Sequence, residues 1–175
     1  MMAEDSLQRY RKNLAKSVLF EHLEPAELDV IIAYCRLVDA TARQTLLAEG
    51  KKGEGLYIVL EGEIEVFLPE HVAGGTMRRP SRIHLNRLGP GRCFGEYGVI
   101  DDQPSSASVE TVTDARLCLL TRASFREIVD QHDRIGKVLY ANLLRFLTRR
   151  LRSKDKELDL ILLMEESGSG WDDAG

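Results

Sequence analysis

Apolar positions follow a helical spacing at both ends of this chain and a spacing near two between them. Residues 6–34 place apolar side chains at intervals of three and four. From Leu37 the period shortens, and short runs are separated by breaks that contain Gly or Pro. Helical spacing returns over residues 121–164. Many short strands at even spacing, with turn residues between them, are typical of an antiparallel barrel or jelly roll. The strand-like runs are CRLVDA, QTLLAEG, GLYIVLEG, EIEVFLPE, SRIHLNRL, ASVETV and ARLCLLT.

Two residues mark helix starts in this pattern. Pro25, with Glu27 in the first turn, predicts a helix that begins near residue 25. Thr121 is an N-cap candidate for the helix that follows the last strand. The fold class is therefore α+β, an antiparallel jelly-roll β-barrel with N-terminal helices and a long C-terminal helix. The predicted parts are a helical leader at 1–34, the barrel at 35–121, the C-terminal helices at 122–164 and a flexible tail at 165–175.

The last helix has two apolar faces. One face is a seam with heptad spacing and one polar interruption, which is typical of a coiled coil. Its positions are Leu144, Leu147, Leu151, Lys154, Leu158 and Ile161. The other face is expected to pack on the barrel and contains Ile135, Val138, Leu139, Leu143 and Phe146. A helix with two apolar faces needs two partners, so the seam predicts a homodimer. The alternative is a helix that packs wholly within its own domain.

Composition limits the classes of function. The chain has 175 residues and a net charge of −4, which favours one domain with an appendage and argues against a general nucleic-acid binder. Cys35, Cys93 and Cys118 lack metal-ligand spacing, so reduced thiols and no metal site are expected. The N-terminus has no apolar signal region, and no apolar run reaches membrane-spanning length. The sequence predicts a cytoplasmic protein without a membrane partner.

The stretch FGEYGVIDDQPSSASVET at 94–111 has the composition of an anion cradle. Gly95 leaves room for the backbone to approach an anion, and a helix start offers free N–H groups. Glu96 places a carboxylate beside them. No Lys or Arg stands between Phe94 and Arg116, so the cradle lacks a cation in its own sequence. An enzyme is not expected, because adjacent acids such as those at 101–102 are usually solvated and no His stands near the serines.

The order of these parts resembles the cyclic nucleotide-binding domain family, which includes the catabolite activator protein. The resemblance covers roughly residues 14–160. It depends on SVLFEHLEPAELDVI in the leader, AEGKKGEGLYIVLEGEIEV in the barrel and RLGPGRCFGE before the cradle. In the activator subfamily a helix-turn-helix follows the long helix. None follows it here, so DNA binding by this chain alone is not expected.

The resemblance also implies a ligand site. In the family the carboxylate after F-G takes the ribose 2′-hydroxyl, and Glu96 matches it. The family's phosphate-binding Arg falls at Ser105 here. Losing one or two charge-assisted bonds, each worth roughly 1.5–3 kcal/mol, weakens a cyclic nucleotide by roughly ten- to several-thousand-fold. The implied ligand-binding residues are Gly95, Glu96, Tyr97, Gly98, Val99, Ser105, Ser106 and Ala107.

Two further residues align with the roof of that pocket. Lys154 and Asp155 occupy the region from which the dimer helix of the activator subfamily contacts the purine. Lys154 has an alternative role as a polar residue that sets the register of the seam, which is the commoner one.

Two hypotheses follow from the sequence. The first is a stand-alone sensory or regulatory domain that takes a small anion, with a weakly bound cyclic nucleotide in place of any cofactor. The C-terminal helix then reports to an effector protein that the sequence does not identify. The second is a degenerate fold that serves dimerisation or protein docking without a nucleotide.

Overall fold

The strands form two antiparallel sheets of four strands in the computed structural model, which describes residues 7–101 and 103–168. The strand orders are β1-β8-β3-β6 and β2-β7-β4-β5, and the predicted jelly roll is confirmed. The first sheet contains β1 (Arg36–Ala40), β8 (Ala115–Thr121), β3 (Gly55–Glu61) and β6 (Cys93–Phe94). The second contains β2 (Thr45–Leu47), β7 (Ser108–Thr111), β4 (Ile64–Leu68) and β5 (Ile83–Leu88). The short β6 is absent from the strands predicted by periodicity.

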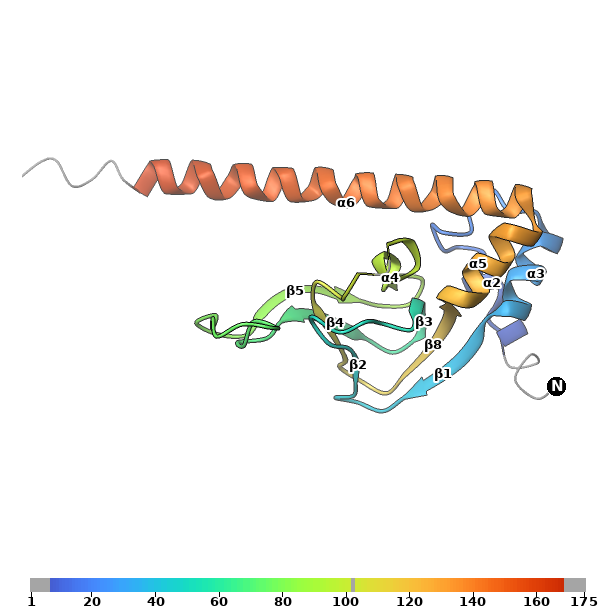
Figure 1. Ribbon diagram of the computed structural model, residues 1–175, viewed down its shortest axis with the longest axis horizontal. Helices are drawn as coiled ribbons and strands as arrows, with labels where there is room; N and C mark the ends of the chain where they lie inside the picture. The colour runs from blue at the N-terminus through green and yellow to red at the C-terminus, as the bar shows by residue number, and fades with distance from the viewer. Residues whose placement is uncertain (1–6, 102, 169–175) are drawn as a thin grey trace, which may run out of the picture.

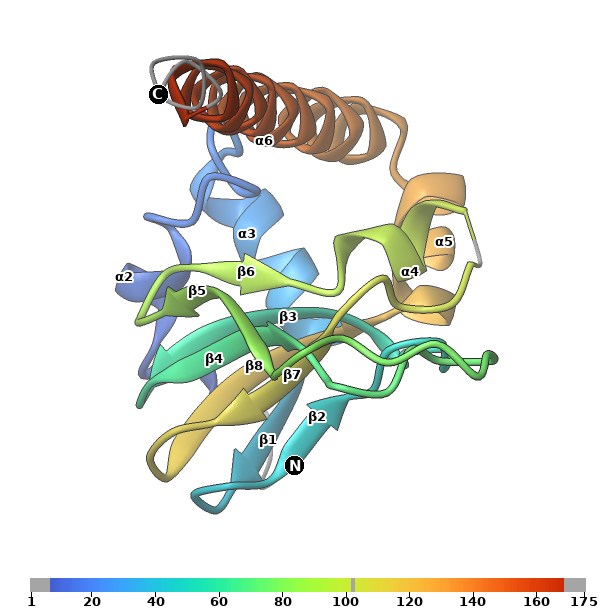
Figure 2. The same ribbon diagram turned by 90° about the vertical axis from the view of Figure 1, so that its left-hand side faces the viewer.

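The helices cover one side of this barrel. They are α2 (Arg11–Leu14), α3 (Pro25–Tyr34), α4 (Glu96–Ile100), α5 (Arg122–Gln131) and α6 (Asp133–Gly168). Figures 1 and 2 show α6 running along the top of the molecule, with α4 between it and the sheets. The leader helices and α5 gather beneath the N-terminal part of α6. Within the described residues no helix is long and apolar enough to cross a membrane.

Two hydrophobic cores lie on opposite faces of β3 and β8. The barrel core takes Tyr57 and Val59 from β3, and the helical core takes the alternating residues Leu56, Ile58 and Leu60. Both strands are therefore buried on both faces, which explains their continuous apolar runs. The helical core also includes the face of α6 that the sequence assigned to the barrel. Its residues Ile135, Leu139 and Leu143 are buried, and Phe146 packs against them.

The helix boundaries agree with the sequence signals at two positions. Pro25 is the first residue of α3, whose start carries a reciprocal capping box between Glu24 and Glu27. Thr121 caps α5 by accepting a hydrogen bond from the backbone N–H of Ser124 at 3.1 Å. The last helix runs to Gly168, beyond the predicted end at residue 164. The part of the predicted tail at 169–175 lies outside the described residues.

The leader differs from the helical segment predicted over residues 6–34. The short α2 ends at Leu14, and turns fill most of the chain before Pro25. His22 has a φ of 66°, a left-handed conformation that no helix continues through. The side chain of Asn142 in α6 holds this segment by donating hydrogen bonds to the carbonyls of Leu19 (2.9 Å) and Glu21 (2.7 Å). Tertiary contacts therefore determine the conformation of the leader and override the helical periodicity of its sequence.

The loop between β4 and β5 is anchored to the barrel through Arg79. Arg79 donates two hydrogen bonds to Glu49, at 3.0 and 2.8 Å, and both side chains are largely buried. Arg79 also donates to the carbonyl of Pro69 at 2.8 Å. The loop is thus tied to the segment that follows β2.

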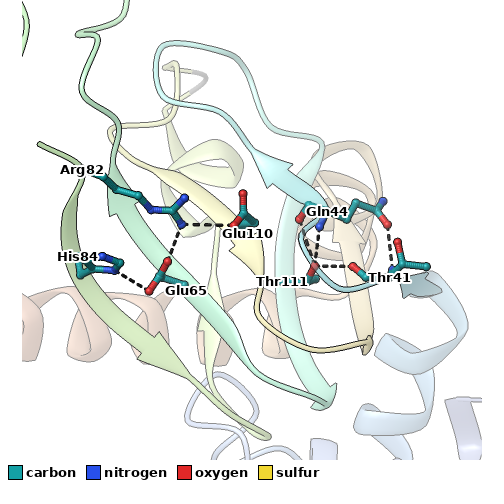
Figure 3. Close-up of polar contacts among 7 residues, drawn as sticks. All are labelled: Thr41, Gln44, Glu65, Arg82, His84, Glu110 and Thr111. Carbon is teal, nitrogen blue, oxygen red and sulfur yellow. Dashed lines mark hydrogen bonds and ion pairs between the residues drawn. The ribbon is translucent and has the colours of Figure 1, made fainter.

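Polar contacts also fix the second sheet, as Figure 3 shows. Glu65 accepts from Arg82 at 2.5 Å and contacts His84 at 2.6 Å, and Arg82 also reaches Glu110. Although burial raises the pKa of Glu65, the hydrogen bonds from His84 and Arg82 outweigh it and hold that pKa below its ordinary value. At the β1–β2 corner, Thr111 donates to the carbonyl of Thr41 and accepts from the N–H of Gln44.

Candidate functional site

The stretch 94–111 begins with a glycine whose conformation the fold requires. Gly95 has a φ of +79° and stands at the N-cap of α4. A Cβ at this position would lie 2.4 Å from the carbonyl oxygen of Gly55. β6 pairs with β3 just before it, with Phe94 opposite Tyr57. The chain therefore turns sharply from the sheet into α4 against the backbone of β3.

The far end of the same stretch is held by the turn between β2 and β3. The N–H of Ser105 donates to the carbonyl of Lys51, and the N–H of Gly50 donates to the carbonyl of Ser105, both at 2.8 Å. Three residues later, the hydroxyl of Ser108 accepts from the N–H of Glu49 at 3.0 Å. Ser105 is half-buried and Ser106 is exposed. Ser105, where the family resemblance places an Arg, is thus held by backbone hydrogen bonds to the turn that contains Lys51.

Glu96 joins this site to the long helix. Its side chain is 2% exposed, and its Oε1 accepts a hydrogen bond from Nη1 of Arg150 in α6. The guanidinium of Arg150 also lies 5.8 Å from the ring centres of Tyr97 and Phe146. Arg150 is 45% exposed, so one side of it faces solvent. The carboxylate of Glu96 at the start of α4 and the guanidinium of Arg150 on α6 therefore form an ion pair. Its Glu96 side is buried, and its Arg150 side is open to solvent.

Burial dominates the electrostatics of this pair. Desolvation raises the pKa of Glu96 above its ordinary value, while Arg150 and a backbone hydrogen bond lower it by less. The neighbouring Cys93 is also buried, and burial together with the charge of Glu96 raises the pKa of its thiol to about 12. Cys93 is thus an unreactive thiol at neutral pH. All three cysteines are free.

The cations absent from the local sequence come from other elements. Arg150 arrives from α6, and Arg122 from the start of α5 donates to the carbonyl of Gly98 at 2.5 Å. The backbone of Lys51 pairs with Ser105, and the chain continues to Lys52. The site therefore contains positive charge although residues 95–115 contain none. Sequence reasoning missed Arg150; the available signal was its spacing of four from Phe146, which turns both side chains to one face.

The predicted site residues fall into three groups in space. Residues 95–99 form the cap and body of α4, where the side chain of Val99 is buried in the helical core. Residues 105–107 form the approach to β7. Lys154 and Asp155 lie on the exposed part of α6, where Lys154 pairs with Glu157 on its own helix. The structure thus connects the first group, residues 95–99, to Arg150 through the side chain of Glu96.

Two aromatic rings of the barrel core lie next to the start of α4. Tyr57 and Phe94 stack with ring centres 4.9 Å apart and planes 4° from parallel. Two cavities lie elsewhere. One of about 280 Å³ lies between α3 and the start of α6. The other, of about 430 Å³, lies beside Asp39, Gln44, Glu61 and Arg116. Neither of these two cavities is lined by residues of α4 or of 105–107.

This geometry agrees with comparisons to known proteins. A sequence profile described as cyclic nucleotide-binding domain matches residues 37–132. The chain belongs to the cyclic nucleotide-binding domain family. It is 34% identical over 149 residues to the cyclic AMP receptor protein of Thermus thermophilus, which covers 85% of this chain and 64% of that relative. It is 30% identical over 150 residues to a CRP-like cAMP-activated global transcriptional regulator of Mycobacterium tuberculosis, covering 85% of this chain and 62% of that regulator.

Solved structures share the fold of this family member. The catabolite activator protein of Thermus thermophilus superposes with a TM-score of 0.70 at 32% identity, covering 83% of this chain and 63% of that one. A cyclic nucleotide-binding domain of Methylobacillus flagellatus superposes with a TM-score of 0.73 at 23% identity, covering 88% and 83%. The chain therefore spans less than two thirds of the curated relatives described above.

Proposed function

We propose that this chain is a regulatory domain that takes a small anionic ligand between α4 and residues 105–107 and reports its presence through α6. Cyclic nucleotides are the first candidates, with an affinity lowered by Ser105. The contact between Glu96 and Arg150 carries the proposal, because it joins the binding stretch directly to the output helix. The names of the relatives, a cyclic AMP receptor and a cAMP-activated regulator, support a regulatory role.

The mechanism follows from competition for one carboxylate. A ligand hydroxyl that donates to Glu96 shares a carboxylate whose Oε1 already accepts from Arg150. Ligand binding therefore changes the hydrogen bonds that Arg150 makes. Because Arg150 belongs to α6, this changes the free energy of α6 in its place over the barrel. A ligand shifts a two-state element only by its difference in affinity for the two states. The α6 helix is suited to this role because residues 148–164 are all exposed in the single chain.

The affinity test is a calorimetric titration with cyclic AMP and cyclic GMP. Wild-type protein is expected to bind weakly, and Ser105→Arg is expected to bind the same nucleotide about tenfold or more tightly by restoring a charge-assisted phosphate contact. Ser81→Arg is the matched control, because Ser81 is exposed in the β4–β5 loop and gains the same charge. If neither wild type nor Ser105→Arg gives binding heat at millimolar nucleotide, nucleotide sensing is refuted.

One observation favours a second candidate, a docking or dimerisation module without a nucleotide. The charge of Glu96 already has a partner within the chain, so the buried carboxylate is satisfied without a ligand. A failed titration combined with a dimeric protein selects this candidate. Both candidates share the inference that α6 pairs with a second copy through its exposed seam, where Leu144, Leu151, Leu158 and Ile161 are 53–66% exposed.

A further inference from the structure

Two of the cations that reach the proposed site are already bonded to groups of the protein. Arg150 donates to the buried carboxylate of Glu96, and Arg122 donates to the carbonyl of Gly98 at 2.5 Å. A ligand anion beside residues 105–107 is better served by a cation whose donors the protein does not already engage. This inference rests on the proposed function, in which an anionic ligand binds at that place.

The turn between β2 and β3 borders the place where the anion is expected. The N–H of Ser105 donates to the carbonyl of Lys51, and the N–H of Gly50 donates to the carbonyl of Ser105, both at 2.8 Å. A Cβ at Gly53 would lie 3.8 Å from Oγ of Ser105, so this hydroxyl lies on the side of the turn. The side chain of residue 105 and the β2–β3 turn therefore border the same space.

A largely buried ion pair holds this turn in place. Glu49 accepts two hydrogen bonds from Arg79 of the β4–β5 loop, and the two side chains are 12% and 19% exposed. Ala73 of the same loop packs on Gly50, where a Cβ would lie 2.4 Å from the Cβ of Ala73. The backbone that precedes Lys51 is thus fixed before any ligand arrives, so binding does not have to order it.

Lys51 offers this turn's available cation. Its side chain is exposed, and within residues 7–101 and 103–168 it makes no hydrogen bond or ion pair. A lysine carries a compact ammonium with three donors on a flexible four-carbon stem. Because the carbonyl of Lys51 is bonded to the N–H of Ser105, this stem is long enough to bring the ammonium to the space beside the Ser105 side chain.

We propose that Lys51 supplies the positive charge that binds the anion of the ligand, since Ser105 itself offers none. The ammonium reaches the anion from the β2–β3 turn and binds it as a point charge. It makes fewer bonds than the paired donors of a guanidinium, which accounts for the weak binding expected of the wild type. One ammonium balances the single negative charge of a cyclic phosphodiester, so this is the ligand class that the site favours.

The first test is an NMR titration with cyclic AMP, which measures dissociation constants in the millimolar range. Lys51→Met removes the charge and is expected to raise the dissociation constant about three- to tenfold, because a partly solvated contact is weaker than a buried one. Lys51→Arg keeps the charge and is expected to bind about as tightly as wild type. Lys16→Met, which removes the same charge from an exposed position of the leader, is the control.

The second test combines Lys51→Met with Ser105→Arg. In Ser105→Arg the guanidinium holds the anion, so the loss of the ammonium is expected to cost less than about twofold in affinity. A residue that only supports the fold of the turn costs the same factor in both backgrounds. The difference between the two losses therefore separates a contact with the ligand from a structural role.

The outcomes separate this inference from the proposed function. A loss of affinity in Lys51→Met that Ser105→Arg suppresses supports the assignment of Lys51. If Ser105→Arg binds cyclic AMP but Lys51→Met equals wild type, or wild type does not bind, the assignment is overturned and the sensory role stands. A loss in Lys52→Met as large as that in Lys51→Met also overturns it, because the effect then belongs to the charge of the whole turn. Binding by neither wild type nor Ser105→Arg overturns the proposed nucleotide sensing and the role of Lys51 together.

Discussion

At the scale of single residues, the site depends on how one buried carboxylate is compensated. Burial raises the pKa of Glu96, and Arg150 offsets only part of that cost. A carboxyl group whose pKa is raised in the folded state stabilises the fold at low pH, and this contribution is lost as pH rises through the folded pKa. Arg150 in α6 therefore favours the ionised form of Glu96, against the burial that favours the protonated form.

Replacing Arg150 by Gln is expected to make the stability of the protein depend more steeply on pH. The pKa of Glu96 then rises further, so the variant loses more stability at pH 8 than at pH 5. The loss at pH 8 is about 1–2 kcal/mol, below the 3–5 kcal/mol for fully buried pairs because Arg150 is half in solvent. Urea unfolding at both pH values measures it. Arg149→Gln, which changes an exposed neighbour, serves as control; equal losses at the two pH values would contradict the argument.

At the scale of elements, α4 owes its position to the backbone at its start. Gly95 adopts a left-handed φ against the carbonyl of Gly55, and β6 fixes the two residues before it. The pattern F-G-E was readable in the sequence, and so were the strands on either side. The approach of Gly95 to β3 was not, because the two segments are forty positions apart. Sequence reasoning thus found the turn but not its neighbour.

Gly95→Ala is expected to destabilise the fold and displace α4. An Ala here carries the cost of a left-handed conformation and a Cβ at 2.4 Å from a backbone oxygen, together more than about 2 kcal/mol. Thermal and urea unfolding measure the loss. Gly89→Ala is the control, because a Cβ at Gly89 meets nothing within 4 Å. Similar stabilities for the two variants would show that the turn relaxes without strain.

At the scale of the whole molecule, the leader places α6 over the barrel. Buried Asn142 binds two carbonyls of the leader, and Arg145 donates to its side-chain oxygen at 2.9 Å. The same helix carries Arg150 two turns later. The barrel, the leader and α6 are therefore connected through the helical core, and the contact with Glu96 depends on that arrangement.

Asn142→Leu is expected to loosen the leader and weaken the contact between α6 and the site. The carbonyls of Leu19 and Glu21 lose their donor, which costs about 2–4 kcal/mol for one buried and one partly buried acceptor. Hydrogen exchange is expected to quicken over residues 15–24 and over α4. Asn86→Leu, at an exposed position of β5, is the control. Unchanged hydrogen exchange in α4 would show that the conformation of the leader does not affect the site.

The sequence by itself determined the elements and their kinds. Alternation and Gly or Pro breaks located seven of the eight strands that the described residues form, because each strand's pattern depends only on its own residues. Thr121 and Pro25 fixed helix starts for the same local reason. The heptad seam of α6 was readable because helical neighbours are three and four positions apart. The family resemblance and its departure at Ser105 were also present in the order of residues alone.

Only the tertiary structure decided which distant groups meet. Arg150 reaches Glu96 across 54 positions, and Arg79 reaches Glu49 across 30. No local propensity encodes such pairs, because they arise when the helical core fixes α6 and when the sheets bring the loops together. The stretch 94–111, which contains no Lys or Arg, therefore receives its positive charge from α5 and α6.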